Sequence, residues 1–161
     1  MTRVGLTFDG LKALTGQELG VSEWITVDQE KINQFADCTG DRQWIHVDVE
    51  RTKKESPFRK PIAHGYLTLS MLTAMAMDIN AVPENTQAAF IHGLDSVRFI
   101  APVKSGTRVR MRSTLLSVED KGPGQYLARS ANTVEIEGDP RPALTAELLV
   151  LFYERRRKRA S

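Results

Sequence analysis

The sequence has a single cysteine, almost no net charge and no apolar run long enough to cross a membrane. Cys38 alone cannot form an intramolecular disulfide or a metal site built from paired cysteines. The 22 basic and 20 acidic residues nearly cancel, which gives no overall field for nucleic acid or membrane. Residues 1–10 lack the basic, apolar and small-residue order of a signal peptide. We therefore expect a cytoplasmic protein that binds neither nucleic acid nor membrane.

Several catalytic and cofactor-binding motifs are also absent. The chain has no Gly-x-Ser-x-Gly turn, no phosphate-binding loop and no dinucleotide fingerprint, so we expect no bound cofactor. Its 161 residues contain no repeats and no linker rich in Pro, Gly or Ser, which predicts one domain over residues 1–161. The C-terminus, about residues 154–161, is a basic tail that we expect to be a solvated end.

The most apolar stretch is residues 66–79, in which only Thr68, Ser70, Thr73 and Asp78 are polar. A helix that is apolar on nearly all sides should be buried. It follows Pro61-Ile62-Ala63-His64-Gly65, and the first N–H groups of a helix have no intrahelical partner. Because Gly65 carries no side chain, a carbonyl oxygen could approach these donors and be polarised by them. Alternatively, Gly65 only eases the turn into the helix.

The remaining elements are short helices followed by strands. A strand is expected at 20–27, a helix from the capping Asp28 through Cys38 with Gly40 as its terminator, and a brief helical turn at 48–54. Further strands are expected at 89–100, with a bend at Gly93, and at 107–118, 125–137 and 143–153. This order predicts an α+β fold in which an antiparallel β-sheet wraps around a long central helix.

Asp41 and His46 are the candidate acid–base pair. Their five-residue offset would place them about 140° apart on a continuous helix and on opposite faces of a strand, so only a bent segment after Gly40 could bring them together. A carboxylate beside an imidazole can orient it, raise its pKa and share a water molecule with it. The alternative is a surface aspartate and a core histidine.

The other candidate side chains have simpler interpretations. Asp41, His46 and His64 could ligate a metal, but their spacing is unspecific, and we predict no metal. We expect the His64 ring to fix the turn before Gly65. Cys38 lies beside apolar residues and is interpreted as a small buried hydrophobe, not a nucleophile. For His92, in a predicted strand, we expect a structural role or none.

Three sequence blocks resemble the MaoC-like hydratases, and within that family the nodulation-protein-N-like branch. The blocks occur in the same order as in the family, and the resemblance as a whole spans about residues 16–152. The three blocks are Phe35-Ala36-Asp37-Cys38-Thr39-Gly40-Asp41-Arg42-Gln43-Trp44-Ile45-His46, Ile62-Ala63-His64-Gly65 and Val97-Arg98-Phe99-Ile100-Ala101-Pro102-Val103-Lys104-Ser105-Gly106. The resemblance implies a hot-dog fold, in agreement with the α+β prediction.

The resemblance also implies an activity, the reversible (R)-specific hydration of trans-2-enoyl thioesters. The family motif has Gly-Asp, four residues and then His, which Gly40, Asp41 and His46 match. These two side chains would activate water, and the Gly65 N–H would polarise the thioester carbonyl. Gln43-Trp44 stand where Asn-Pro is commoner, which leaves the acyl-chain preference open.

Partners and substrate contacts follow from the same resemblance. It implies a homodimer with continuous sheets and an acyl channel at the interface, and a substrate carried by coenzyme A or an acyl-carrier protein. Basic residues at Arg59, Lys60 or 155–159 could contact the coenzyme A phosphates. The candidate substrate-binding residues are Trp44, Ile62, His64, Tyr66, Arg59 and Lys60. An acyl-CoA thioesterase and a non-catalytic acyl-thioester binding protein remain alternative functions.

Overall fold

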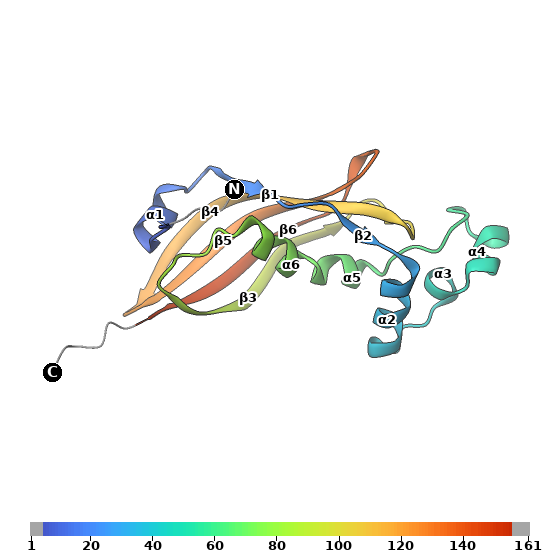
Figure 1. The fold of residues 1–161 in the computed structure, drawn as a ribbon, viewed down its shortest axis with the longest axis horizontal. Helices are drawn as coiled ribbons and strands as arrows, with labels where there is room; N and C mark the ends of the chain where they lie inside the picture. Colours follow the sequence, from blue (N-terminus) through green and yellow to red (C-terminus); the bar gives the residue numbers. More distant parts are fainter. Residues whose placement is uncertain (1–4, 156–161) are drawn as a thin grey trace.

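A computed structural model describes residues 5–155, which form an antiparallel sheet curved around two short helices (Figure 1). The helices are α1 (Phe8–Ala13), α2 (Gln29–Thr39), α3 (Trp44–Val47), α4 (Val49–Glu55), α5 (Gly65–Ser70) and α6 (Leu72–Ile79). The strands are β1 (Glu18–Val21), β2 (Ile25–Val27), β3 (Thr86–Phe99), β4 (Thr107–Gly122), β5 (Gln125–Ile136) and β6 (Asp139–Glu154). Helices early and strands late give the predicted α+β class.

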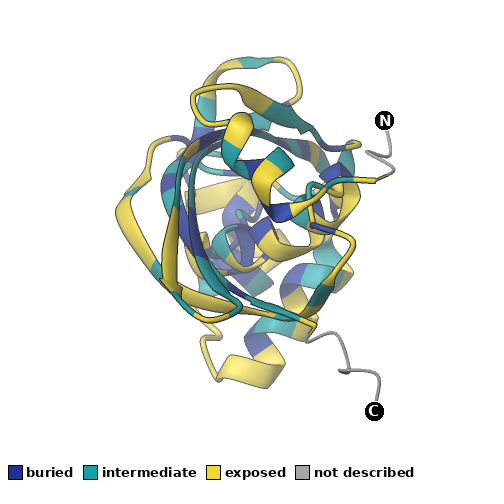
Figure 2. Cartoon of the chain, turned by 90° about the vertical axis from the view of Figure 1, so that its left-hand side faces the viewer, coloured by how far each residue is buried: buried dark blue, intermediate teal, exposed yellow. Residues whose placement is uncertain are grey.

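The sheet has the order β1-β4-β5-β6-β3, and β2 also pairs with β4. Every strand pair is antiparallel. The predicted bend at Gly93 coincides with a shift in the register between β3 and β6 at Ile91/Gly93. β3 lies at one end of the order, so β6 covers only one of its two edges. Buried residues gather inside the curve of the sheet, around α5 and α6 (Figure 2).

The central segment is two helices, where the sequence predicted one. The chain leaves regular helix at Met71, between α5 and α6. There the Ser70 hydroxyl donates to the Leu67 carbonyl at 2.7 Å, and the Met71 N–H donates to the same carbonyl. A serine that bonds back to its own helix competes with the backbone ladder and bends it. This competition gives a physical reason for the break at Met71.

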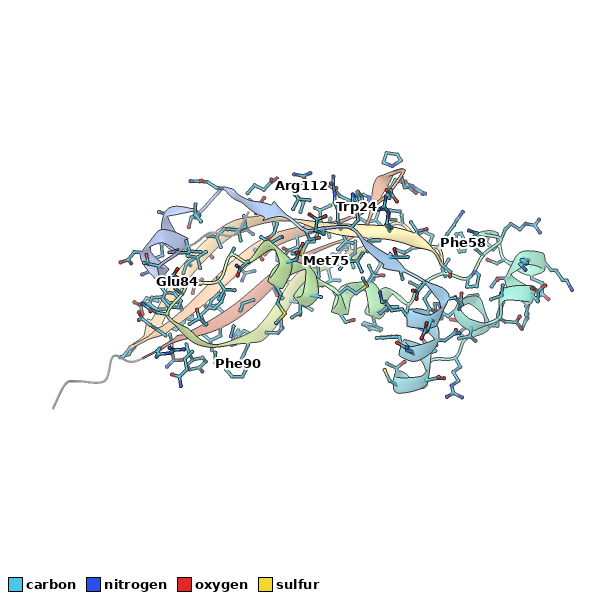
Figure 3. The ribbon with its side chains drawn as sticks, viewed as in Figure 1. Trp24, Phe58, Met75, Glu84, Phe90 and Arg112 are labelled. Carbon is cyan, nitrogen blue, oxygen red and sulfur yellow. The ribbon has the colours of Figure 1, made fainter. Side chains whose placement is uncertain are left out.

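The same segment is not buried on all sides within the single chain, contrary to the prediction. Leu67, Leu72 and Met75 pack into the main core, and Met75 lies under the sheet in Figure 3. Tyr66 and Met77, in contrast, are each 72% exposed. Composition predicts that apolar groups avoid water, but it does not say whether the same chain covers them.

Local capping explains the helix that leads to the site. The Asp28 side chain accepts from the Lys31 N–H at 2.8 Å and begins α2. Gly40 ends α2 with φ of 81°, a left-handed conformation that glycine adopts without strain. Both boundaries were predicted. The predicted strand at 20–27 is divided into β1 and β2, because residues 22–24 leave the regular ladder.

The N-terminal helix α1 had no clear signal in the sequence. Thr7 caps it by accepting from the Gly10 N–H at 3.0 Å, and Phe8 and Leu11 pack against Leu115, Ala128 and Phe152. It therefore covers the end of the sheet far from α2, α3 and α4 (Figure 1). Within residues 5–155, no helix combines the length and apolar character needed to span a membrane. Most of the predicted basic tail, residues 156–161, lies outside the described residues.

Candidate active site

Asp41 and His46 come together because the chain bends between them. α2 ends at Gly40, three residues follow without regular structure, and α3 then carries His46. A carboxylate oxygen of Asp41 and one ring nitrogen each of His46 and His64 all lie within 4.8 Å of one another. Asp41 is exposed while both histidines are buried. A bent segment after Gly40, as the sequence required, thus places a solvent-accessible carboxylate beside a buried imidazole.

The protonation state of His46 follows from its surroundings. Nδ1 lies 2.6 Å from the backbone oxygen of Ile62, and because a carbonyl can only accept, Nδ1 carries the proton. Nε2 of the neutral ring is then free to accept a proton. Burial lowers the pKa of His46 below its ordinary value, and the charge of His64 lowers it further, against opposing effects of the Ile62 carbonyl and Asp41. The geometry and the pKa both favour a neutral base.

His64 is bound to the Asp41 loop and does not cap the helix. Its Nε2 donates to the backbone oxygen of Asp41 at 2.9 Å, and its ring stacks on His46 with centroids 3.8 Å apart. Its side chain makes no capping hydrogen bond at the start of α5, so the ring holds this turn through the Asp41 backbone and not through the helix N-terminus. Nδ1 of His64 is buried and has no hydrogen-bond partner within residues 5–155.

Each histidine ring makes a hydrogen bond to a backbone oxygen in the chain segment that carries the other histidine. His46 bonds to the backbone oxygen of Ile62, two residues before His64, and His64 bonds to that of Asp41, five residues before His46. The Ile62 N–H also donates to the Ile45 oxygen at 3.1 Å. Each segment therefore supplies the acceptor that orients the imidazole of the other.

Gly65 and His46 line the same cavity, which has a volume of about 250 Å³. The Gly65 N–H, first in α5, has no acceptor within residues 5–155. A Cβ at Gly65 would lie 3.0 Å from the Phe99 ring, so glycine keeps the approach to this N–H open. The cavity is thus lined by a free backbone donor and by a buried histidine whose Nε2 can accept a proton.

The predicted substrate-binding residues occupy different positions around this cavity. Ile62 lines it, while Tyr66 is exposed and packs edge-on against Phe99, a lining residue. The Arg51 guanidinium lies over the Trp44 ring, with its Cζ 4.3 Å from the ring centroid. Arg59 donates to the carbonyls of Lys53 and Lys54, and Lys60 is exposed nearby in the chain. His64 does not line the cavity.

Other lining residues were not singled out from the sequence. Thr68 lies one helical turn after Gly65, Phe99 ends β3, and Ala101 and Val103 come from the segment after it. Helical spacing from Gly65 could have indicated Thr68, whereas the contact with 99–103 depends on the tertiary fold. Cys38 is exposed, so its expected burial is wrong; the apolar neighbours in sequence lie on the other side of α2. His92 is exposed on β3.

Comparison with known proteins places this geometry in a family. Residues 11–135 match the family described as MaoC like domain. A 3-hydroxyacyl-thioester dehydratase Z of Mycobacterium tuberculosis is 46% identical over 142 residues, which cover 88% of this chain and 93% of that protein. Nodulation protein N of Rhizobium leguminosarum bv. viciae is 50% identical over 138 residues, which cover 85% of each chain.

A solved structure shows the same fold. The (R)-hydratase from A. caviae involved in PHA biosynthesis superimposes with a TM-score of 0.69 and 20% identity, over 84% of this chain and 94% of that one. The α+β hot-dog class is therefore confirmed, with its central helical segment divided at Met71. As its motifs predicted, the chain belongs to the MaoC-like dehydratase family.

Proposed function

We propose that the protein is a hydro-lyase that catalyses the reversible (R)-specific hydration of trans-2-enoyl-CoA to (R)-3-hydroxyacyl-CoA. The observation that carries this proposal is the pairing, in one cavity, of the free Gly65 N–H and the neutral His46, with the Asp41 carboxylate beside it. The relatives named dehydratase add support. A donor and a base in one cavity suit addition to a polarised double bond.

In the hydration direction, the thioester carbonyl accepts a hydrogen bond from the Gly65 N–H, which draws electron density away from Cβ. Asp41 and His46 hold one water molecule. As the water oxygen bonds to Cβ, its proton passes to one of the two side chains, and the same pair returns one proton to Cα from the same face, which restores its starting state. The negative charge that develops on the thioester oxygen is stabilised by the Gly65 N–H. Dehydration is the reverse sequence.

The spacing of the acid–base groups suits one shared water molecule. The three side-chain atoms lie within 4.8 Å of one another. One water molecule accepting or donating at about 2.8 Å bridges that separation easily. We propose that the reaction uses neither metal nor cofactor and that the coenzyme A thioester is substrate only.

Crotonyl-CoA distinguishes this proposal from its alternatives. We expect loss of absorbance at the enoyl band with no release of free thiol, because water attacks Cβ and leaves the thioester intact. Thiol release from a saturated acyl-CoA would indicate a thioesterase. Binding of enoyl-CoA without any turnover would indicate a non-catalytic binding protein. Either result would overturn the hydratase proposal.

The pH profile should report the lowered pKa of His46. As a base, His46 must be neutral, and burial and His64 hold its pKa below 6.5. The fall of kcat/KM for crotonyl-CoA at low pH should therefore have its midpoint below pH 6.5. His64→Asn removes a neighbour that lowers the pKa of His46, so its midpoint should lie at a higher pH than that of the wild type. A wild-type midpoint above pH 6.5 would contradict this assignment of the base.

We further propose that the protein is a homodimer joined along β3. One edge of β3 has no partner strand within residues 5–155, and its side chains include exposed apolar groups. Phe90 projects outward from β3 (Figure 3), and Ile91, Leu94, Phe99 and Tyr66 are exposed nearby. An uncovered apolar edge invites pairing with another strand, and a second copy would extend the sheet and cover the acyl channel.

A matched pair of substitutions tests the dimer. Leu94 on β3 and Leu116 on β4 are almost equally exposed, at 39% and 38%. Leu94→Glu places a charge in the proposed interface and should give a monomer by sedimentation velocity, whereas Leu116→Glu should remain dimeric like the wild type. A monomeric wild type, or a dimeric Leu94→Glu protein, would contradict an interface on β3.

The anionic part of coenzyme A requires basic contacts near the mouth of the cavity. Lys60 comes two residues before Ile62, which lines the cavity, and Arg59 precedes it on the same loop. We propose these two residues as phosphate contacts, with the basic tail as a further source. A cytoplasmic location and an acyl-carrier protein as alternative carrier also stay predictions.

A further inference from the structure

A second cavity, of about 80 Å³, lies at the opposite end of the central helices from the acid–base pair. It is enclosed by α1, the C-terminal end of α6 and the inner faces of β4, β5 and β6. Figure 1 shows α1 at this end of the sheet and α2–α4 at the other. Its lining is mainly apolar, but it includes the polar side chains Ser113, Ser130 and Asn132.

Ser113 and Asn132 are buried residues with unused hydrogen-bonding capacity, and the Oδ1 atom of Asn132 is fully buried. Ser113 is 4% exposed, and its hydroxyl makes no hydrogen bond within residues 5–155. Asn132 is 3% exposed; its Nδ2 donates to the backbone and hydroxyl oxygens of Ser130, both at 3.0 Å, and its Oδ1 has no partner in the same residues. An unmade hydrogen bond at a buried group is costly, so this end of the cavity favours a polar occupant.

The two groups are placed to act on one ligand atom. Ser113 on β4 and Asn132 on β5 are directly opposite each other in the sheet register. Directly opposed side chains in an antiparallel pair have Cβ atoms about 4.5–5.5 Å apart. A ligand hydroxyl between them could donate to Asn132 Oδ1 and accept from the Ser113 hydroxyl. A methyl group in the same place would leave both unpaired.

Residues of the two central helices line this cavity, the catalytic one and a groove between them in the sequence order of the helices. Gly65 and Thr68 line the catalytic cavity, Leu69, Leu72 and Thr73 line a groove of about 330 Å³, and Ala76 and Ile79 line the distal cavity. Within α5 and within α6 these positions are mostly three or four residues apart, which places them along one face of each helix. Leu148 of β6 lines both the groove and the distal cavity. The groove and the distal cavity therefore adjoin at Leu148, and together with the catalytic cavity they would give an acyl chain one path along the central helices.

The length of the path sets the length of the chain that would fill it. From Gly65 to Ala76 is 11 residues, roughly 16 Å at the helical rise. An extended chain covers about 1.2 Å per bond, so roughly 13 bonds separate a thioester carbonyl at Gly65 from a group that enters the distal cavity.

We propose that the distal cavity binds the end of the acyl chain and that Ser113 and Asn132 select a chain with a hydroxyl group at that end. This inference rests on the proposed function for the position of the thioester. The ligand class is an acyl thioester of about twelve carbons, hydroxylated at or next to its terminal carbon. Water molecules held in the cavity are the alternative occupant, and they would give no preference for such a chain.

Binding of saturated acyl-CoAs tests the proposal without relying on turnover. By calorimetry, the wild-type protein should bind ω-hydroxydodecanoyl-CoA about three- to tenfold more tightly than dodecanoyl-CoA, as expected for one or two neutral hydrogen bonds. Ser113→Ala should reduce this ratio to about one. Ser117→Ala, the same substitution on β4 outside the cavity lining, should keep the wild-type ratio. The pair ω-hydroxyhexanoyl-CoA and hexanoyl-CoA should show no preference for the hydroxyl, because neither chain reaches the cavity.

Three outcomes would overturn the inference: equal affinities for the two long chains, a ratio that survives Ser113→Ala, or the same preference in the hexanoyl pair. The first is the result expected if the cavity holds only water. Crotonyl-CoA hydration is measured separately on the same protein. If the proposed function is wrong, the protein will not hydrate crotonyl-CoA. If only the inference about the chain end is wrong, the protein will hydrate crotonyl-CoA but will give one of the three binding results above.

Discussion

Asp41→Asn and His46→Ala should each lower kcat for crotonyl-CoA hydration by about 10²–10⁴, the usual cost of losing an acid–base group. The asparagine amide keeps the shape of Asp41 but can neither take up a proton nor attract the imidazolium that forms when His46 accepts one. In His46→Ala, the cavity-lining imidazole proposed as the base is removed. Because both side chains are proposed to hold one water molecule, the double variant should lose little more activity than the worse single variant.

Asp37→Asn is the matched control for the Asp41 change. Asp37 lies four residues earlier, on α2, and its carboxylate pairs with Arg42 at 3.0 Å on the surface. Such an exposed pair contributes little to stability, so this variant should retain wild-type kcat. Asp41 is also exposed, and its replacement should leave thermal unfolding unchanged. Full activity in both Asp41→Asn and His46→Ala would remove the pair from the mechanism.

Gly65→Pro should lower kcat by about 10²–10³ relative to Gly65→Ala, the typical cost of losing one oxyanion donor. Proline lacks the N–H that is proposed to polarise the thioester. Residue 65 is the first of α5, a position where proline is well tolerated, and His64 has φ −60° and ψ 138°, which a following proline accepts. The helix should therefore still form.

Gly65→Ala measures the steric effect alone. Alanine keeps the N–H and adds a Cβ 3.0 Å from the Phe99 ring, a contact that proline would make as well. The difference between the two variants thus reports the N–H. Circular dichroism and thermal unfolding check that both are folded. If the two variants hydrate crotonyl-CoA equally fast, the Gly65 N–H has no part in the reaction.

Local signals predicted the parts of the fold that depend on neighbours in sequence. Asp28 and Gly40 fixed the ends of α2 through capping and left-handed geometry, and alternation predicted β4 and β5 to within a few residues. The Asp41–His46 pair was predicted from a motif, because spacing alone did not bring the two together. Its geometry depends on α2 ending at Gly40 and α3 beginning at Trp44.

Features that depend on distant residues were missed or predicted wrongly. α1 has only six residues, too few for a periodic signal, and its position depends on Leu115 and Phe152 far along the chain. The break at Met71 results from one serine hydroxyl, which composition does not reveal. The partner of His64 was missed because a backbone carbonyl, present at every residue, carries no sequence signature.

The reciprocal bonds between the segments of His46 and His64 make the two motifs a single transferable unit. An engineer who grafts residues 40–46 from a relative without 62–65, or the reverse, would join an imidazole to a carbonyl set at a different angle. The hydrogen bond that decides which ring nitrogen carries the proton would then be lost for each histidine. Chimeras that exchange both segments together should keep the tautomers, and with them the direction in which the base faces its substrate.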